Sequence, residues 1–337
     1  MRVKTLIATS DTAYTQHISQ YISEYHANII EVSVCNTVEH LRNTLSAKRY
    51  DVAFMDADLI KEADLSGVKL PLLLWSHQDA TETSIVPGRV IKHRRISKTV
   101  SDVLEKYAKV SGNINLPEER AGKITAVWSP AGGVGKTSVA LACATAFATE
   151  EKEVFYLNLE AFSSIPAYFQ EKSKSISAVF EMLGTDSGNV KILTQGICDM
   201  SNGIKYLCSP ENFDDMSILS VENVRELVTC CADTTDELIV DLSAVCDART
   251  RQVFELADNI LLIIDNTDSS QHKLMQFMTQ SNVFECIKDK ITLIKNKGTT
   301  NCVSISEKSI SLPHVDSADT QFVYKTLAGK FAENKEN

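Results

Sequence analysis

The sequence predicts an α/β protein with two successive parallel sheets, each covered by helices on both faces. Two observations predict this fold class. Short apolar runs rich in β-branched residues alternate with amphipathic helical patterns through both halves of the chain, and one run leads through a glycine-rich turn directly into a helix. Alternating strands and helices form parallel sheets, because each helix returns the chain to the edge where the next strand begins.

The first block contains five apolar runs that we interpret as strands. Helical patterns lie between them, through Ile18, over Val38–Leu45 and, after the last run, over Val100–Tyr107. We therefore expect one parallel sheet in a first domain over residues 1–108. The predicted strands are Val3–Ala8, Ile29–Val34, Val52–Met55, Leu72–Trp75 and Val90–Ile91.

The second block follows a polar stretch with Gly and Pro, which we interpret as a linker over residues 109–122. Its apolar runs are nearly continuous, as in strands buried on both faces. We expect a second domain over residues 123–330 and a frayed polar tail, Gly329–Asn337. The predicted strands are Ile124–Trp128, Val154–Leu159, Ile204–Leu207, Leu238–Val240, Asn259–Ile264 and Ile291–Ile294.

Charge and cysteine usage exclude several classes of protein. The net charge is −10, and residues 1–110 hold 14 Lys and Arg against 13 Asp and Glu, so the acidic excess lies in the second block. An acidic domain lacks the basic face that binding to nucleic-acid phosphates requires. The nine cysteines show no C-x-x-C spacing, and the histidines show no zinc-ligand spacing. Cysteines within apolar stretches (Cys143, Cys208 and Cys286) are typical of buried free thiols in a reducing compartment.

Membrane insertion is not expected either. Apolar runs such as Leu70–Trp75 and Ile260–Ile264 are too short to span a bilayer, and the N-terminus lacks the apolar core of a signal peptide. We therefore expect a cytoplasmic protein without a transmembrane segment.

The most specific motif is a glycine-rich loop between a predicted strand and a helix. Gly132, Gly133 and Gly135 let the backbone fold tightly, so that successive N–H groups point at phosphate oxygens. The helix N-terminus adds a partial positive charge. In this arrangement Lys136 reaches the β- and γ-phosphates, and the Thr137 hydroxyl enters the shell of a magnesium ion. The loop predicts a site for Mg-ATP or Mg-ADP.

This loop resembles the deviant P-loop of the MinD/ParA superfamily, Lys-Gly-Gly-Val-Gly-Lys-Thr, whose first residue is replaced here by Ala131. The resemblance implies a MinD/ParA-type parallel sheet, an ATP or ADP cofactor with Mg²⁺, and a homodimer. In that family the leading lysine reaches the partner's phosphates, whereas Ala131 has no charge and no reach, which argues against efficient hydrolysis. The residues expected at the phosphates are Ala131, Gly132, Gly133, Val134, Gly135, Lys136, Thr137 and Ser138.

Two strand ends resemble further motifs of the superfamily. Asp241 closes a strand that resembles Walker B, where a carboxylate holds magnesium through a water molecule, and Asp247 is a weaker alternative. Asn158 and Glu160 stand where the superfamily has a strand ending in Asp-x-Asp. By that resemblance Glu160 would orient an attacking water as a catalytic carboxylate. A polar strand end without catalytic work fits the same pattern equally well.

The purine would lie further along the chain. Asn296 follows a strand that resembles the superfamily strand ending in an adenine-binding Asn, and its amide carries the donor and acceptor needed to read a purine edge. The segment with Leu312 and Pro313 resembles the one whose backbone flanks the base.

The first block resembles a response-regulator receiver domain, a flavodoxin-like fold, in its order of strands and helices. Asp56 stands at the phosphoacceptor position, but Thr9 and Ser10 replace the acidic pair that holds magnesium there, with Asp11 one place beyond. A hard divalent cation needs several oxygen ligands. We therefore interpret Asp56 as a vestigial phosphoacceptor position, with phosphorylation as the alternative. The basic run Lys92–Arg95 is interpreted as a solvated loop, or else as a dock for an acidic partner.

An atypical receiver followed by a MinD/ParA-type domain resembles the TadZ/CpaE family. The resemblance implies an ATP-binding localisation factor for the secretion machinery of Flp-type (Tad) pili, which meets machinery proteins or a landmark protein at a cell pole or the inner face of the membrane. Nucleotide would control its dimer state, with slow or absent hydrolysis. The alternatives are an active ATPase that positions DNA or the septum, and a two-domain signalling regulator.

Overall fold

The computed structural model describes residues 2–27, 29–75, 86, 88–92, 96–110, 122–184, 187–300, 305–306 and 308–335. The chain divides into two compact units. The first contains Met1–Glu118, Lys172–Lys174 and Thr185–Ile197, and the second contains Glu119–Glu171, Ser175–Gly184 and Cys198–Asn337. Both units are α/β, and the predicted fold class is confirmed.

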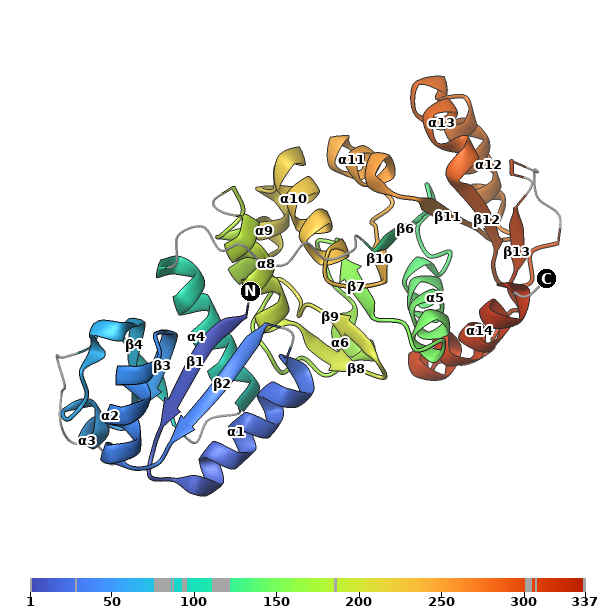
Figure 1. Ribbon diagram of the computed structural model, residues 1–337. Helices are drawn as coiled ribbons and strands as arrows, with labels where there is room; N and C mark the ends of the chain where they lie inside the picture. Colours follow the sequence, from blue (N-terminus) through green and yellow to red (C-terminus); the bar gives the residue numbers. More distant parts are fainter. Residues whose placement is uncertain are drawn as a thin grey trace. The chain divides into compact units, whose positions relative to one another are not determined.

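The first unit is built on a five-stranded sheet in the order β2-β1-β3-β4-β5, with every pair parallel (Figure 1). This is the strand order of flavodoxin-like folds. All five predicted strands are present, and β4 begins four residues before its predicted start. The strands are β1 (Val3–Ala8), β2 (Ile30–Cys35), β3 (Tyr50–Met55), β4 (Val68–Trp75) and β5 (Arg89–Ile91).

Helices cover both faces of this sheet. Alternate residues of β1 show why: Val3 and Ile7 belong to one apolar core, and Leu6 and Ala8 belong to another on the opposite face. The first core is covered by α1 (Thr12–Tyr25) and α4 (Ile96–Val110), and the second by α2 (Val38–Ala47), α3 (Ala57–Ile60) and the 3₁₀ turn η1 (Leu65–Gly67).

A helix from far along the chain joins the first unit. This helix, α8 (Ser187–Ile197), packs against α4, and Ile192 is part of the same core as Leu104. A Cβ atom at Gly196 would clash with the side chain of Leu104, so the two helices approach closely at this glycine. A division of the chain at residues 109–122 does not anticipate this helix, because its partner α4 lies far earlier in the chain.

The second unit is built on an eight-stranded sheet in the order β13-β12-β11-β6-β10-β7-β9-β8. The six predicted strands are confirmed, and short edge strands β8 and β13 are added to them. The strands are parallel except for β8, which pairs antiparallel with β9. Their bounds are β6 (Lys123–Trp128), β7 (Val154–Asn158), β8 (Asp199–Ser201), β9 (Ile204–Tyr206), β10 (Glu237–Asp241), β11 (Asn259–Ile264), β12 (Ile291–Lys295) and β13 (Ser309–Ser311).

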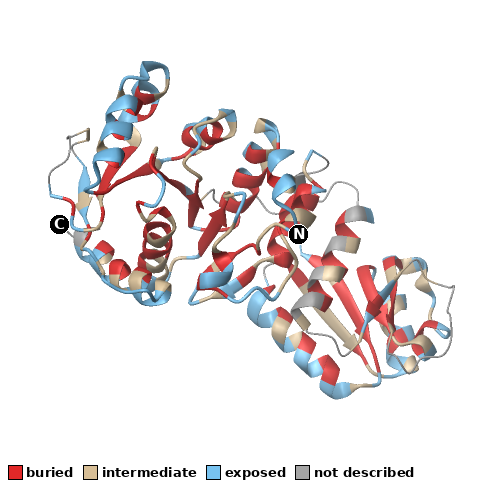
Figure 2. Ribbon diagram, turned by 180° about the vertical axis from the view of Figure 1, so that it is seen from behind, coloured by how far each residue is buried: buried red, intermediate tan, exposed pale blue. Residues whose placement is uncertain are grey.

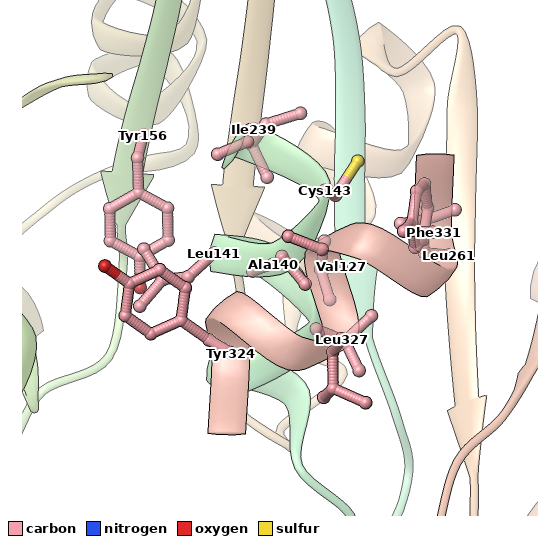
Figure 3. Close-up of a cluster of buried hydrophobic side chains, with 14 of the residues drawn as sticks. Val127, Ala140, Leu141, Cys143, Tyr156, Ile239, Leu261, Tyr324, Leu327 and Phe331 are labelled. Atoms are coloured by element: carbon pink, nitrogen blue, oxygen red, sulfur yellow. The ribbon is translucent and has the colours of Figure 1, made fainter. Parts of the chain in front are cut away.

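Two layers of helices enclose this sheet. One face carries α5 (Lys136–Thr149), which lies between the sheet and α14 (Thr320–Lys335) and is therefore apolar around most of its circumference (Figures 2 and 3). The other face carries α10 (Val221–Ala232), α11 (Ala248–Leu256), α12 (Asp268–Met278) and α13 (Ser281–Ile287). The short elements are α6 (Ile165–Tyr168), α7 (Ser177–Phe180), α9 (Phe213–Ser217) and η2 (Lys288–Lys290).

The expected frayed tail is wrong for the residues that the structure describes. Helix α14 continues through Gly329 to Lys335, and Phe331 is only 3% exposed. The helix persists because Tyr324, Leu327 and Phe331 recur every three or four residues and pack on α5 (Figure 3). Because the residues after Phe331 are mostly polar, the sequence did not indicate that the helix is anchored here by a buried apolar face.

Cysteine burial agrees with expectation at two of the three sites. Cys143 and Cys208 are buried free thiols, but Cys286 is exposed, so its predicted burial is wrong. Cys286 lies on α13, a short helix whose apolar contacts are made by Phe284 and Ile287 instead. In the described part of the chain, none of the helices has the length and apolarity needed to cross a membrane.

Replacement of the aromatic anchor of α14 tests this packing. We expect Phe331→Ala to lower the free energy of unfolding by about 3 kcal/mol, because a large buried ring is lost and leaves a cavity. Phe322→Ala on the same helix is the matched control, since Phe322 is 56% exposed and its loss is expected to cost little. Denaturant unfolding followed by circular dichroism measures both, and equal effects of the two substitutions would contradict the described packing.

Candidate nucleotide-binding site

The predicted site residues of the second unit gather at one edge of its sheet. Strands β6, β7, β10 and β12 run in the same direction, so their carboxyl ends meet there. Asp241 at the end of β10 lies opposite Val127 of β6 and Asn158 of β7. The glycine-rich loop follows β6, Glu160 follows β7, and Asn296 follows β12. The structure therefore brings together residues that lie far apart in the sequence.

The loop after β6 needs its glycines for two different reasons. Gly133 and Gly135 have φ angles of 74° and 92°, a backbone region that favours glycine. A Cβ atom at Gly135 would also lie 2.5 Å from Nδ2 of Asn296. By contrast, a Cβ at Gly132 or Gly133 would meet nothing within 4 Å. These two glycines border open space, as a cradle for a ligand would.

Helix α5 begins where this loop ends. Its first residues are Lys136, Thr137 and Ser138, whose backbone N–H groups lie in the unpaired first turn of the helix and can donate to an anion. Lys136 is 8% exposed, and its Nζ lies 3.8 Å from Oε1 of Glu160. The Ser138 hydroxyl lies 3.4 Å from that of Tyr168. The first turn therefore presents donors and one ammonium group beside the open loop.

Asp241 is a fully buried carboxylate that is only half satisfied. Its Oδ2 accepts a hydrogen bond of 2.8 Å from the Tyr156 hydroxyl and a longer one of 3.4 Å from the Asn158 amide. Its Oδ1 makes no hydrogen bond to any described residue. The pKa of Asp241 is raised to about 7, chiefly by burial and then by the charge of Glu160, and the nearby hydroxyl groups of Thr137 and Tyr156 oppose this shift. Such a group gains from a nearby cation.

The protein side chains fit a magnesium ion whose coordination shell is completed by nucleotide phosphate oxygens. Among the described residues, no cluster of three or more His, Cys, Asp or Glu side chains forms a complete metal site. Magnesium typically needs only one or two carboxylates, since nucleotide phosphates and waters complete its shell. The orphaned oxygen of Asp241 and the hydroxyl of Thr137 are suitable protein ligands for that arrangement.

Tyr156 is a site residue that the sequence analysis missed. Its hydroxyl donates to Asp241 and accepts from the Asn158 amide at 3.1 Å, so it holds both side chains. Burial raises the pKa of Tyr156 well above its usual value, so the phenol keeps its proton. The signal was available: residues 156 and 158 are two apart on one strand and therefore point to the same face.

The other predicted polar residues have mixed surroundings. Burial raises the pKa of Glu160, and the nearby Lys136 ammonium opposes that shift. Asn158 acts as a framework residue, because its Oδ1 accepts from the Glu160 backbone N–H. Asp247, the weaker alternative to Asp241, is the N-cap of α11 and pairs with Arg249, which explains it structurally.

Asn296 lies directly behind the glycine-rich loop. Its Nδ2 donates to the carbonyl oxygen of Val134 over 2.8 Å. Leu312 extends the edge strand, since its N–H donates to Lys295 and its carbonyl accepts from Gly298, with Pro313 next in the chain. Asn296 and Leu312 therefore lie at the carboxyl ends of β12 and β13, at the same edge of the sheet as the loop.

The first unit places Asp56 in a different environment. Its carboxylate accepts from the Thr9 hydroxyl at 2.6 Å and from the Ser10 backbone N–H at 3.3 Å. The ammonium group of Lys92 lies 3.3 Å from Asp56 and also donates to Thr9 at 2.9 Å. Asp11 caps α1 and lies 3.8 Å from the same ammonium.

The interpretation of Lys92 as part of a solvated loop is therefore wrong. Its side chain is only 11% exposed, because it spans the ends of β1 and β3 to neutralise Asp56. The rest of the basic run, residues 93–95, lies outside the described residues.

Comparisons with known proteins find the fold in solved structures. A ParA family ATPase from Chlorobium tepidum aligns with a TM-score of 0.53 and 20% identity, over 64% of this chain and 96% of that chain. MinD from Aquifex aeolicus aligns with a TM-score of 0.49 and 15% identity, over 64% of this chain and 97% of that chain. No family model and no curated protein matches the sequence. At such low identity the likeness to the ParA family ATPase shows a shared fold and nothing about activity.

The raised pKa of Asp241 predicts a pH dependence of stability without nucleotide. Its folded pKa of about 7 exceeds the model-peptide value of 3.8. The stability that this proton contributes is therefore fully present below about pH 4 and is lost as pH rises through about 7. We expect the melting temperature of wild type to fall by a few degrees relative to Asp241→Asn over this range. Thermal unfolding of both proteins across the range checks this, and a constant difference between them would refute it.

Proposed function

We propose that the second unit binds Mg-ATP and Mg-ADP at the carboxyl edge of its sheet. The observation that carries the proposal is the open glycine-rich loop leading into α5, next to a buried carboxylate with an unpaired oxygen. Anions bind at such helix N-termini because unpaired N–H groups and the helix dipole favour negative charge. A cation at Asp241 would in turn remove the penalty of its unpaired oxygen.

Different residues would bind the phosphates, the magnesium ion and the purine. The loop, Lys136 and Ser138 would hold the phosphates, while Thr137 and Asp241 would hold magnesium, which neutralises phosphate charge when bound. Asn296 and the backbone at Leu312 and Pro313 would contact the purine.

Several features favour nucleotide binding with slow or absent hydrolysis. Ala131 is 3% exposed and packs in the core beneath the loop, so no cation extends from this position. Asn158 donates hydrogen bonds to Tyr156 and Asp241, and its side chain is an amide, which cannot accept a proton from water. Glu160 is the remaining candidate to orient a water molecule, and Lys136 lies beside it. These features support a nucleotide-gated homodimeric scaffold.

The biological role that we propose is that of a localisation factor for the Flp (Tad) pilus machinery. Support comes from the resemblance of the two-unit sequence to the TadZ/CpaE family and from the ParA-like fold of a solved neighbour. In this role the receiver-like part of the first unit, residues 1–108, would bind machinery or landmark proteins at the pole. The nucleotide domain, residues 123–330 extended by the rest of α14, would control dimer state.

The competing role is an ATPase that positions DNA or the septum. Two observations weigh against it. The chain beyond residue 110 carries 20 Lys and Arg against 31 Asp and Glu, which disfavours phosphate-backbone binding. The main apolar face of α14, formed by Tyr324, Leu327 and Phe331, is buried in the core with α5 and is not available to enter a membrane surface.

Calorimetry with Mg-ADP and Mg-ATP tests the central proposal. We expect wild type to bind both, and Lys136→Ala to bind at least about tenfold more weakly, because charge-assisted contacts to phosphate are lost. Lys288→Ala is the matched control, since Lys288 is an exposed lysine on η2 that pairs with Glu285 of α13. Absence of binding by wild type would refute the proposal, and steady hydrolysis faster than about 1 s⁻¹ would contradict the scaffold role.

For the first unit we propose that Asp56 is not a working phosphoacceptor. Lys92, Thr9 and the Ser10 N–H already satisfy its carboxylate, so a magnesium ion has little to gain there. Treatment with acetyl phosphate and magnesium is expected to leave the intact mass unchanged, as in Asp56→Asn. A phosphate adduct on wild type that is missing from Asp56→Asn would show the signalling regulator to be the better reading.

A further inference from the structure

Two successive side chains behind the glycine-rich loop hold two successive carbonyl groups of that loop. Nδ2 of Asn296 donates to the carbonyl oxygen of Val134 over 2.8 Å, and Nζ of Lys297 donates to that of Gly133 over 2.7 Å. The sequence analysis assigned a role to Asn296 alone.

These bonds determine where the loop's N–H groups point. A trans peptide is planar, and its C=O and N–H point in opposite directions. When Lys297 holds the carbonyl of Gly133, the N–H of Val134 is turned away from Lys297, and Asn296 does the same to the N–H of Gly135. These two N–H groups belong to the set that would cradle phosphate.

Lys297 is itself held in place. Its ammonium lies 3.1 Å from Oδ2 of Asp265, whose side chain is only 5% exposed. Asp265 in turn accepts from the N–H and hydroxyl of Thr267, the N-cap of α12. The contact therefore connects the ends of β11 and β12 to the loop after β6, across three neighbouring strands of one sheet.

The backbone at Lys297 also supports a specific function. Its φ angle is 56° and that of the following Gly298 is 69°, so two successive residues are left-handed. Such a conformation costs free energy for a residue with a long side chain and usually marks a turn or a functional constraint. Here the turn directs the side chain back onto the loop, where Gly133 and Asp265 hold it.

We propose that Lys297 is a positioning residue for phosphate binding, which acts through the carbonyl of Gly133 rather than through contact with the base. The inference rests on the proposed nucleotide function of the same site. It implies that the phosphate grip is weakened when Lys297 is lost, whether or not the ligand carries a purine. Asn296 would then have two roles, since its Nδ2 holds the loop carbonyl of Val134 while the rest of its amide would be left to contact the base.

The experiment compares two ligands, Mg-ADP and magnesium pyrophosphate, which lacks base and ribose. By calorimetry on the full chain, Lys297→Met is expected to weaken both ligands by a similar factor, about tenfold. Lys297→Arg is expected to retain most of the affinity, because a guanidinium can still donate to the carbonyl. Lys288→Met, which removes an exposed lysine from another ion pair, is expected to leave both affinities unchanged.

Each result decides the inference. If Lys297→Met weakens Mg-ADP and leaves pyrophosphate unchanged, Lys297 contacts base or ribose and the inference is wrong. Unchanged binding of both ligands refutes it as well. If wild type binds neither ligand, the proposed function fails together with the inference. Should Lys297→Met not fold, Asp265→Asn decides, because it removes the charge that anchors Lys297 while the amide keeps an oxygen that can accept from Thr267. It is expected to lower both affinities by about threefold. Unchanged pyrophosphate binding there would overturn the inference.

Discussion

The second unit is organised around the cost of a buried carboxylate. Asp241 is fully buried and has one unpaired oxygen, and burial without a partner is expensive for a charged group. The Tyr156 hydroxyl and the Asn158 amide support only its other oxygen. The open glycine-rich loop and the Lys136 ammonium lie at the same edge of the sheet. This edge therefore combines a carboxylate oxygen that a cation would stabilise with N–H and ammonium donors that suit an anion. A magnesium-bound phosphate meets both needs at once.

The first unit shows the opposite solution at the same place in a parallel sheet. Asp56 also stands at a strand's carboxyl end, but Lys92 supplies its counter-charge from within the protein. With Thr9 and the Ser10 N–H, the ammonium leaves the carboxylate well satisfied. One strand-end carboxylate thus keeps an oxygen without a hydrogen-bond partner among the described residues, whereas the other is neutralised by a lysine. The two units share an architecture, and side-chain partners decide which of them has a ligand-dependent charge.

The sequence could predict what local patterns encode. The strands are apolar runs, and the order of motifs was sufficient to place the loop, Asp241 and Asn296 at one edge. The sequence did not reveal the roles of Lys92 and Lys297 or the packing of α8, because each depends on partners that lie far away in the sequence and that no periodic pattern marks. The end of α14 was missed for another reason: one aromatic residue anchors a turn whose other residues are polar. Sequence periodicity predicts helices and strands, but it does not show which single side chains pair across long distances in the sequence.

Under the proposed function, the second unit would bind nucleotide without rapid hydrolysis. A ligand that binds only the folded site stabilises it in proportion to the logarithm of its concentration over its dissociation constant. At this site the gain is coupled to structure, because the loop is held by Asn296 from β12 and faces Asp241 from β10. Nucleotide would therefore order several strand ends together rather than one loop. Since Ala131 contributes no cation across a dimer, that ordering of the site's own surface is the means by which nucleotide would favour association.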